Sequence, residues 1–172
     1  MLAMDCADYI VDMTLKNGLQ ITNLQLQKIL FVLVAEYMRV NPGAEYPLDI
    51  MFKAYDYGPV IPKVYGEYKK YESAPIKSFS VHQKVVFEEG KMRIKKYQYQ
   101  LNNIENWFQL LVNKHLKQLL NINVFKIVDY THALPFWKNN WKKIYKHEDV
   151  VYSVSDICLT KPLTQLIKTE FS

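Results

Sequence analysis

The segment that follows Thr22 constrains the fold more than any other part of the chain. Thr22 and Gln25 have the spacing of a capping box, in which each side chain accepts a hydrogen bond from the backbone of the other residue. Apolar residues then recur at helical spacing, and Phe31 and Val32 widen the apolar surface beyond a single stripe. The recurring positions are Leu26, Ile29, Leu30, Leu33, Val34 and Tyr37. This pattern predicts a central, largely buried helix that ends at Asn41-Pro42-Gly43.

Other segments have the start and stop residues of shorter helices. Gly18 is typical of a helix C-terminus, Pro62 suits a first helical turn, and Asn102 or Asn103 can serve as an N-cap. The predicted helices cover residues 5–17, 62–71, about 103–120, 124–132, and a segment that begins near Pro162 with Leu163, Leu166 and Ile167 facing inward. These helices pack around the central one in the predicted fold.

Residues 78–101 have the period of β-strands instead of helices. Apolar and aromatic residues flank the turn sequence Glu88-Glu89-Gly90-Lys91, which predicts a β-hairpin. They are Val81, Val85 and Phe87 before the turn, and Met92, Ile94, Tyr97 and Tyr99 after it. We find no repeat, low-complexity tract or linker. The fold class that follows is mainly α, a compact helical domain with a small β-hairpin insertion, formed by residues 1–172 as a single domain.

A Gly-Pro turn lies in the loop expected over residues 42–59. Gly58 can adopt a backbone angle that side chains forbid, and Pro59 then fixes the next φ. The flanking tyrosines are thereby held by a stiff turn, where they could close the end of a helical core or offer a protein-binding surface. We expect Tyr57, Pro59 and Val60 to hold the turn against the central helix, with Tyr55 and Tyr65 nearer the surface.

Composition narrows the class of protein. The 172 residues carry a net charge of +5, but only Arg39 and Arg93 are arginines. Arginine forms paired hydrogen bonds with the edges of bases, whereas lysine acts as a solvated point charge and recognises bases poorly. A lysine-rich surface favours solubility or an acidic partner protein over nucleic acid. Cys6 and Cys158 are expected to be free thiols in a reducing compartment. The chain begins without a signal-peptide pattern, and its longest apolar run, 29–35, is too short to span a bilayer, so we expect a cytoplasmic protein.

Catalytic chemistry has little support. The chain has no phosphate-binding glycine loop, no zinc-protease motif and no serine-hydrolase motif, and we expect no catalytic residue, metal or cofactor. One alternative is an enzyme that uses His132 with Asp129 one helical turn before it. Another is a nucleic-acid-binding or membrane-surface patch along residues 138–146 with Trp137, Trp141 and Tyr145. The i, i+4, i+8 spacing of these aromatics favours the face of a core helix.

Three segments together resemble the Panacea domain of antitoxins, also called SocA-like. The first is Ile21–Phe31, similar to that family's capped "ITNLKLQKLLYF" helix, and the second is Ala54–Tyr65, similar to its "AWxYGPVxPxVY" turn. The third, Thr131-His132 with Pro135 and Trp137, resembles a "TH…PW" ending. The chain departs from the pattern in having Tyr55 where tryptophan is usual and Phe136 between Pro135 and Trp137. The resemblance covers about residues 5–141.

The resemblance implies a mostly helical, non-enzymatic protein of bacteria or their phages that neutralises a toxin, typically one encoded beside it. One described family member is an adaptor that delivers its toxin to a protease, and a nucleic-acid-binding regulator is the alternative from another class. The motif residues are expected to be framework: Thr22, Gln25, Leu26, Lys28, Leu30, Tyr57, Gly58, Pro59, Val60, Pro62, His132 and Trp137. The residues expected to contact the partner are Tyr55, Tyr65, Tyr68, Lys69 and Trp141.

Overall fold

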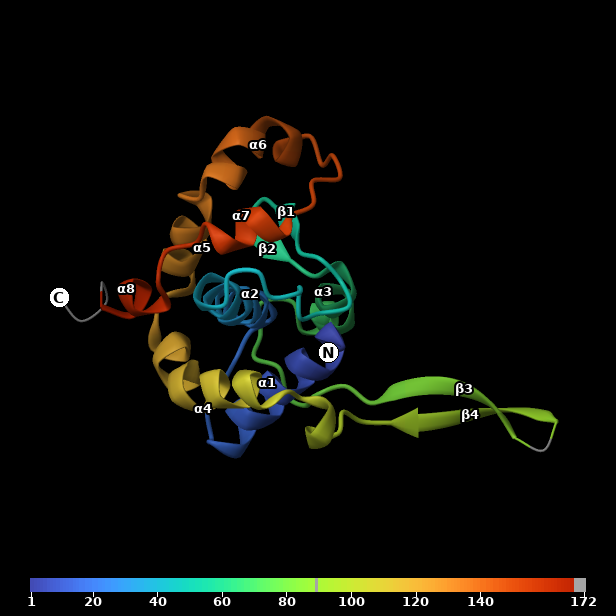
Figure 1. Ribbon diagram of the computed structural model, residues 1–172. Coiled ribbons are helices and arrows are strands. Elements are labelled where there is room, and N and C mark those ends of the chain that lie inside the picture. Colours follow the sequence, from blue (N-terminus) through green and yellow to red (C-terminus); the bar gives the residue numbers. More distant parts are fainter. Residues whose placement is uncertain (89, 169–172) are drawn as a thin grey trace.

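The computed structural model describes residues 1–88 and 90–168 and is mainly α-helical, which confirms the predicted fold class (Figure 1). The helices are α1 Ala3–Lys16, α2 Asn23–Val40, α3 Pro62–Tyr68, α4 Asn106–Asn121, α5 Val124–His132, α6 Pro135–Tyr145, α7 Val154–Cys158 and α8 Leu163–Lys168, with 3₁₀ turns η1 Lys69–Tyr71 and η2 Leu101–Asn103. The strands are β1 Lys53–Tyr55, β2 Gly58–Val60, β3 His82–Glu88 and β4 Lys91–Tyr97.

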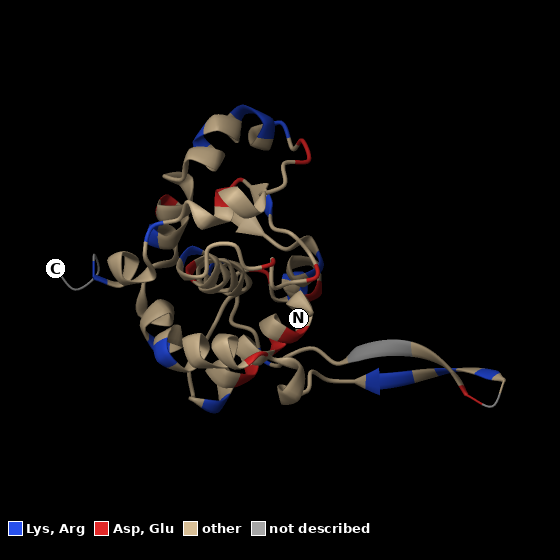
Figure 2. Ribbon diagram, viewed as in Figure 1, with Lys and Arg blue, Asp and Glu red and all other residues tan. Residues whose placement is uncertain are grey.

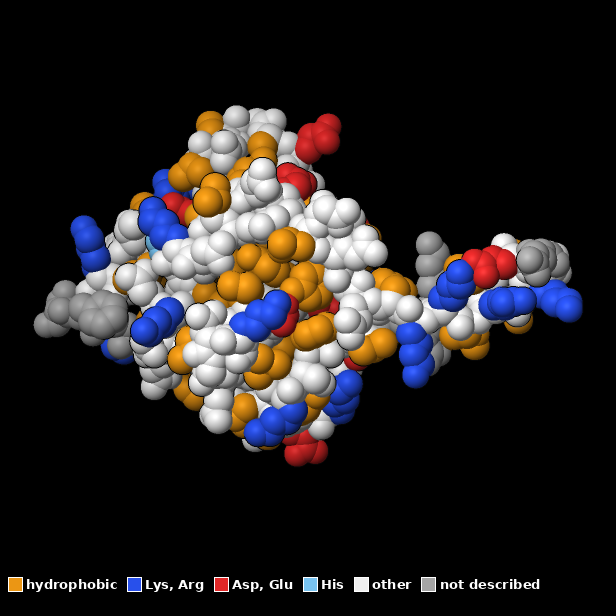
Figure 3. Space-filling model, turned by 90° about the horizontal axis from the view of Figure 1, so that it is seen from below, with side chains coloured by type: hydrophobic (Ala, Val, Ile, Leu, Met, Phe, Trp, Pro, Cys, Tyr) orange, Lys and Arg blue, Asp and Glu red, His pale blue; other side chains and the backbone are white. Residues whose placement is uncertain are grey.

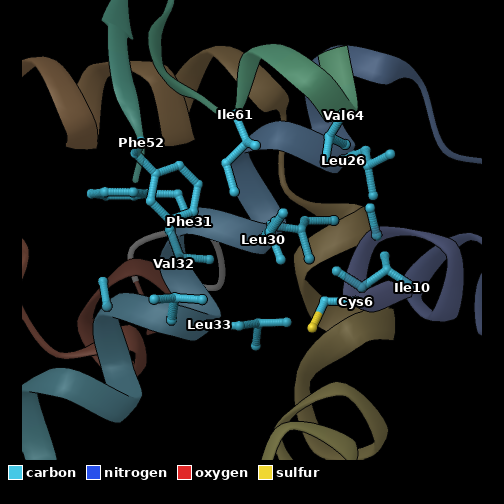
Figure 4. Close-up of a cluster of buried hydrophobic side chains, with 14 of the residues drawn as sticks. Cys6, Ile10, Leu26, Leu30, Phe31, Val32, Leu33, Phe52, Ile61 and Val64 are labelled. Atoms are coloured by element: carbon cyan, nitrogen blue, oxygen red, sulfur yellow. The ribbon is translucent and has the colours of Figure 1, made fainter. Parts of the chain in front are cut away.

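The helix predicted to be central is α2. It contacts α1, α3, α4, α5, α7, α8 and β2, and the other helices surround it in Figure 1. Every residue from Leu26 to Ala35 is buried. Figure 4 shows Leu30 and Leu33 on the side of α2 that faces Cys6 and Ile10 of α1. A helix that is apolar on so many sides is stable only when neighbours cover it on each of them.

The predicted capping box at the start of α2 is present. The Thr22 amide donates to Gln25 Oε1 at 3.0 Å, and the Gln25 amide donates to Thr22 Oγ1 at 3.3 Å. Two backbone donors that the helix itself leaves without partners are thereby satisfied. The Ile21 carbonyl just before the cap accepts a hydrogen bond from the Ile76 amide at 2.8 Å, which joins the start of α2 to the segment that follows α3.

The region expected to be loop over residues 42–59 contains β1 and the start of β2, so that prediction was wrong in part. The two strands pair antiparallel, with Ala54 opposite Pro59. A short C-terminal segment continues the ribbon, because the Ala54 amide donates to the Val150 carbonyl at 2.8 Å and the Tyr152 amide donates to the Phe52 carbonyl at 2.9 Å. Strands of three residues carry too little alternation to be detected in a sequence.

Two helix starts also differ from expectation. The N-cap of α4 is Glu105, whereas Asn102 and Asn103 lie in the preceding 3₁₀ turn. Helix α7 was not predicted, although Ser153 and Asp156 form a capping box at its start. The predicted C-terminal helix is present as α8, with Leu163 and Leu166 buried and Ile167 half-buried.

The predicted hairpin is confirmed and stands away from the helical body (Figure 1). Strands β3 and β4 pair antiparallel, with Val85 opposite Ile94 and Phe87 opposite Met92. Glu89, which the sequence places in the turn, lies outside the described residues. We refer to residues 82–97 as the arm.

Cys6 is buried, Cys158 is half-buried, and both are free thiols, as expected. Burial raises the pKa of the Cys6 thiol well above its ordinary value. Within residues 1–88 and 90–168, no helix combines the length and the apolar character needed to cross a membrane.

Candidate functional site

The turn between β1 and β2 is held by buried side chains from α2 and α5. Gly58 has a φ of +91°, and a Cβ atom at this position would overlap the hydroxyl of Thr131 and lie 3.4 Å from Nζ of Lys28. Lys28 Nζ donates a hydrogen bond to the Pro59 carbonyl at 2.7 Å. Because Lys28 is completely buried, the pKa of its amine lies well below the ordinary value. Glycine is therefore required at residue 58 both for its backbone angle and for the space beside it.

A chain of buried amides joins α2 to the segment that follows the turn. The Ile61 amide donates to Gln27 Oε1 at 3.1 Å, and Gln27 Nε2 donates to Asn23 Oδ1 at 3.1 Å. Asn23 Nδ2 then donates to the Tyr65 carbonyl of α3 at 3.1 Å. Sequence reasoning placed Asn23, Gln27 and Thr131 within the motifs but assigned none of them a role. Two amide side chains four residues apart within an otherwise apolar helix were the available indication, because buried polar groups need partners.

His132 and Trp137 support the turn from the opposite side. Their rings stack with centroids 3.7 Å apart and an interplanar angle of 18°, and Trp137 Nε1 donates to the Tyr55 carbonyl at 3.4 Å. Burial lowers the pKa of His132, while a hydrogen bond with the Asp56 backbone opposes that shift. The carboxylate of Asp129 has a smaller effect on the same pKa. His132 Nε2 is buried without a hydrogen-bond partner among the described residues.

Several other motif residues occupy framework positions. Leu26, Leu30 and Val60 are buried, Pro62 begins α3, and Thr22 and Gln25 form the cap of α2. Tyr57 differs, because 58% of its surface is exposed and its ring meets Phe125 edge to face at a centroid distance of 6.4 Å. The prediction that Tyr57 holds the turn against α2 was wrong, because its side chain is mostly exposed and Lys28 and Thr131 contact the adjacent Gly58–Pro59 segment instead.

Three of the predicted contact residues gather at one groove. Tyr55, Tyr65 and Lys69 line a groove of about 910 Å³, together with the exposed Tyr57. The rings of Tyr55 and Tyr65 meet edge to face at 6.2 Å. The remaining lining residues are Asn23, Leu24, Gln27, Lys53, Ala54, Asp56, Val60, Glu72, Ser73, Ile144, His147, Glu148, Asp149 and Val150. We refer to this feature as the tyrosine groove.

The tyrosine groove has mixed charge and an unusual backbone. Lys53 Nζ forms an ion pair with Asp149 Oδ1 at 2.7 Å along its lining. Glu72 and His147, with φ of 51° and 57°, are the non-glycine residues with positive φ in the part of the chain that the structure describes, and both line the groove. His147 adopts this conformation at the end of α6, where its amide donates to the Ile144 carbonyl at 2.8 Å and the Glu148 amide donates to the Lys143 carbonyl at 3.0 Å.

Tyr68 and Trp141 do not join the other predicted contact residues. Tyr68 is fully buried and donates a hydrogen bond to Asp8, so its assignment to a contact surface was wrong. Trp141 lies on α6 outside the groove lining, with 45% of its surface exposed. The core interpretation of α6 holds for Trp137 but was wrong for Trp141 and Tyr145, which is 56% exposed, because α6 packs against β1 and α5 on one side only.

The chain belongs to the SocA-like antitoxin family. The family model described as "Antitoxin SocA-like, Panacea domain" matches residues 26–138, which is more than half of the chain. The match includes α2 from Leu26 onward, the β1–β2 turn, and the His132–Trp137 stack. A search of curated proteins and a search of solved structures each found no match. Among the described residues, no three His, Cys, Asp or Glu side chains are grouped so that they could hold a metal ion.

Proposed function

We propose that this chain is an antitoxin that binds a toxin protein encoded beside it, and that the tyrosine groove forms part of the contact surface. The observation that supports this most directly is the placement of Tyr55, Tyr57 and Tyr65 around one groove. Tyrosine gives a large contact area with little loss of side-chain entropy. The role requires no catalytic group of this chain, because neutralisation follows from binding alone.

The groove is well suited to binding because its surroundings are fixed before a partner arrives. The turn that carries Tyr57 is held by Lys28 and Thr131, and the Tyr55 carbonyl accepts a hydrogen bond from Trp137. A preorganised surface loses less conformational entropy on association than a mobile one does. The motif residues therefore act as support, and the exposed tyrosines act as contacts.

The test is co-expression of this chain with the product of the neighbouring reading frame, which should be toxic alone and harmless with the antitoxin. Tyr55→Ala/Tyr65→Ala should weaken the purified complex by about 30-fold or more, since central aromatic contacts contribute about 2 kcal/mol or more to binding. Tyr145→Ala is the matched control, because Tyr145 is exposed on α6 and does not line the groove. A neighbour that is not toxic, with no complex on mixing, would falsify the proposal.

Neutralisation could follow from binding or from delivery of the toxin to a protease, and the same co-expression separates the two. Direct neutralisation leaves the toxin concentration unchanged in growing cells. Delivery to a protease shortens the toxin's half-life only while the antitoxin is present. We propose direct binding, because the groove accounts for it without a third protein.

A second candidate function, a nucleic-acid-binding regulator, is favoured by the surface of α6. Trp141 and Tyr145 are exposed there beside Lys142, Lys143 and Lys146, and Lys142 Nζ lies 5.6 Å from the centroid of the Trp141 ring (Figure 2). Aromatic rings and lysines on one surface are typical of single-strand binding. Binding of this kind weakens steeply with salt. A fluorescence assay with no binding even at low salt removes this candidate.

A further inference from the structure

The arm exposes a row of apolar side chains that nothing in the described structure covers. The cross-strand pairs Val85–Ile94 and Phe87–Met92 lie on one face, and these four side chains are between 53% and 77% exposed. An isolated two-stranded hairpin is at best marginally stable in water. Exposed apolar surface of this kind marks an interaction site.

The opposite face of the arm is basic. Lys91, Arg93 and Lys95 alternate with the apolar residues of β4 and are exposed, and an ion pair joins Lys95 to Glu88 across the strands. Within residues 82–97 the sequence has five basic residues and two acidic ones, and the strand register places one of the basic residues, Lys96, on the face of the apolar row. Figure 3 shows basic and apolar side chains along the arm, where it projects from the body. The arm therefore presents different chemistry on each of its two faces.

The base of the arm is fixed to α1 on both sides. The Ser80 amide donates to Asp8 Oδ1 at 3.3 Å just before β3, and the Tyr99 hydroxyl donates to Asp12 just after β4. The Tyr99 ring also meets Tyr9 edge to face at 6.0 Å and Phe79 at 5.6 Å. The arm is therefore held in one direction from the body, which reduces the entropy lost on binding.

From this geometry we infer that the arm inserts into a cleft of the toxin that has one apolar wall and one acidic wall. This inference rests on the proposed function, and it specifies the chemistry of the partner. The apolar face requires an apolar surface, and the basic face requires carboxylates for charge complementarity. The two faces point in opposite directions, so a partner that satisfies both must enclose the arm.

Other occupants fit less well. Two copies of this chain would bring together two arms that each have an excess of basic residues, and the like charges would repel. A nucleic acid would leave the apolar face exposed to water. A bilayer cannot form hydrogen bonds with the outer edges of β3 and β4, which pair only with each other among the described strands. A protein partner can satisfy those backbone groups.

The test measures binding of the neighbouring gene's toxin to purified variants at low and moderate salt. Phe87→Thr/Met92→Thr removes the apolar contacts while keeping strand propensity, and should raise Kd by about 100-fold. Lys91→Glu/Arg93→Glu/Lys95→Glu should slow association by about tenfold at low salt, with a smaller effect at higher salt. The apolar control is Leu159→Thr at the end of α7, where Leu159 is 65% exposed. The charge control, Lys142→Glu/Lys143→Glu/Lys146→Glu, makes the same charge change on α6. Both controls should bind within about twofold of the wild type.

Each other outcome has a defined meaning. Arm variants that bind and neutralise as the wild type does, while Tyr55→Ala/Tyr65→Ala loses binding, overturn the inference and leave the proposed function standing. A wild-type chain that does not neutralise overturns both. Equal weakening by the arm and α6 charge reversals shows general charge attraction and overturns the inserted arm. The wild-type chain could also associate with itself, or bind phosphatidylserine vesicles or RNA. If Phe87→Thr/Met92→Thr abolishes one of these interactions, the arm binds that partner instead, and the inference is overturned.

A measurement on the unmodified complex guards against folding defects in the variants. Amide hydrogen exchange within 85–94 should slow when the wild-type chain binds the toxin, because an enclosed arm is removed from water. Unchanged exchange in a complex that forms tightly overturns the inference without any substitution.

Discussion

The molecule has two antiparallel ribbons that turn at a glycine with positive φ, and the surroundings of those glycines are opposite. Gly58, at the β1–β2 turn, has φ of +91° and no room for a Cβ atom beside Thr131 and Lys28. Gly90, at the tip of the arm, has φ of +72°, and a Cβ atom added there would have no described atom within 4 Å. The first ribbon has strands of three residues, and the arm has strands of seven.

The difference shows how each ribbon is specified. The first ribbon lies almost entirely within the second motif of the sequence, and residues of the first and third motifs on α2, α5 and α6 contact it. None of these motifs lies in the arm, whose shape depends on its own alternation and on the two hydrogen bonds at its base. The first ribbon is therefore supported by the core along its length, whereas the arm is attached to the core only at its base.

The comparison is tested most directly by replacing each glycine with alanine and measuring the stability of both variants. Gly58→Ala should destabilise the protein by about 3 kcal/mol or more, because it adds both backbone strain and an overlap with Thr131. Gly90→Ala should cost about 1 kcal/mol, from the backbone angle alone. Urea denaturation of both variants measures the difference. Equal losses would contradict the assignment of the first ribbon to the core.

Alanine substitution should have different effects on stability at the buried Tyr68 and at the exposed Tyr57. Tyr68→Ala should lose about 3–5 kcal/mol, because it leaves a cavity and removes the hydrogen bond to Asp8. Tyr57→Ala should lose about 1 kcal/mol or less, because Tyr57 projects from the turn into solvent. Thermal unfolding of the pair decides the matter, and a Tyr57→Ala variant that unfolds as readily as Tyr68→Ala would break the comparison.

Buried Lys28 makes the stability of the supported ribbon depend on pH. Burial lowers the pKa of Lys28 in the folded state, so at a pH between the lowered pKa and the ordinary one the unfolded chain holds a proton that the folded chain has released. The free energy of unfolding, relative to Lys28→Met, should therefore rise with pH between the folded and the unfolded pKa of Lys28, by at most about 1.4 kcal/mol per pH unit. The rise ends near the ordinary lysine pKa of about 10.4.

Subtracting the free energy of unfolding of Lys28→Met from that of the wild type cancels the contributions of other titrating groups. The raised pKa of Cys6 has the opposite effect above about pH 8.5, but it is present in both proteins and cancels. Lys91→Glu/Arg93→Glu/Lys95→Glu on the arm should show the wild-type slope. A difference between wild type and Lys28→Met that does not change with pH would contradict a lowered pKa for Lys28.

The smallest expected effect concerns the base of the arm. Tyr99→Phe removes the hydroxyl that donates to Asp12 but keeps the ring contacts, so it should cost about 1 kcal/mol. The loss should be local, with faster amide exchange in the arm and unchanged exchange in α2. Faster exchange in both regions would mean that the arm and the core unfold as one unit.

Local patterns in the sequence were sufficient for α2, α5 and the arm. The Thr22–Gln25 cap indicates hydrogen bonds between residues three positions apart, and the alternation on either side of Gly90 indicates which side chains share a face of the hairpin. Both patterns depend only on residues that are close in the sequence. Tyr57 and Tyr68 were misplaced because their burial depends on distant residues: Lys28 fills the space beside the turn, and Asp8 accepts the Tyr68 hydroxyl from 60 positions away.

The same limit applies to the candidate site. Tyr55, Tyr65 and Lys69 were predicted as contacts from their exposure on a turn and a helix, and they do share one groove. The opposite wall comes from residues 144 and 147–150, which no local pattern connects with the turn. That wall is brought into place by the hydrogen bond from Ala54 to Val150, a pairing set by the folded chain.

The clamped base of the arm has a consequence for how this protein can change. The chain leaves the body at Ser80 and returns at Tyr99, and both points are tied to neighbouring turns of α1. None of the residues 85–88 and 90–97 belongs to the buried core, so we expect that the length and sequence of the arm can be replaced without disturbing α2. The helical body therefore provides a constant attachment point for an arm that can vary. Exchanging residues 82–97 between relatives should transfer the preference for a toxin and leave the stability of the helical body unchanged.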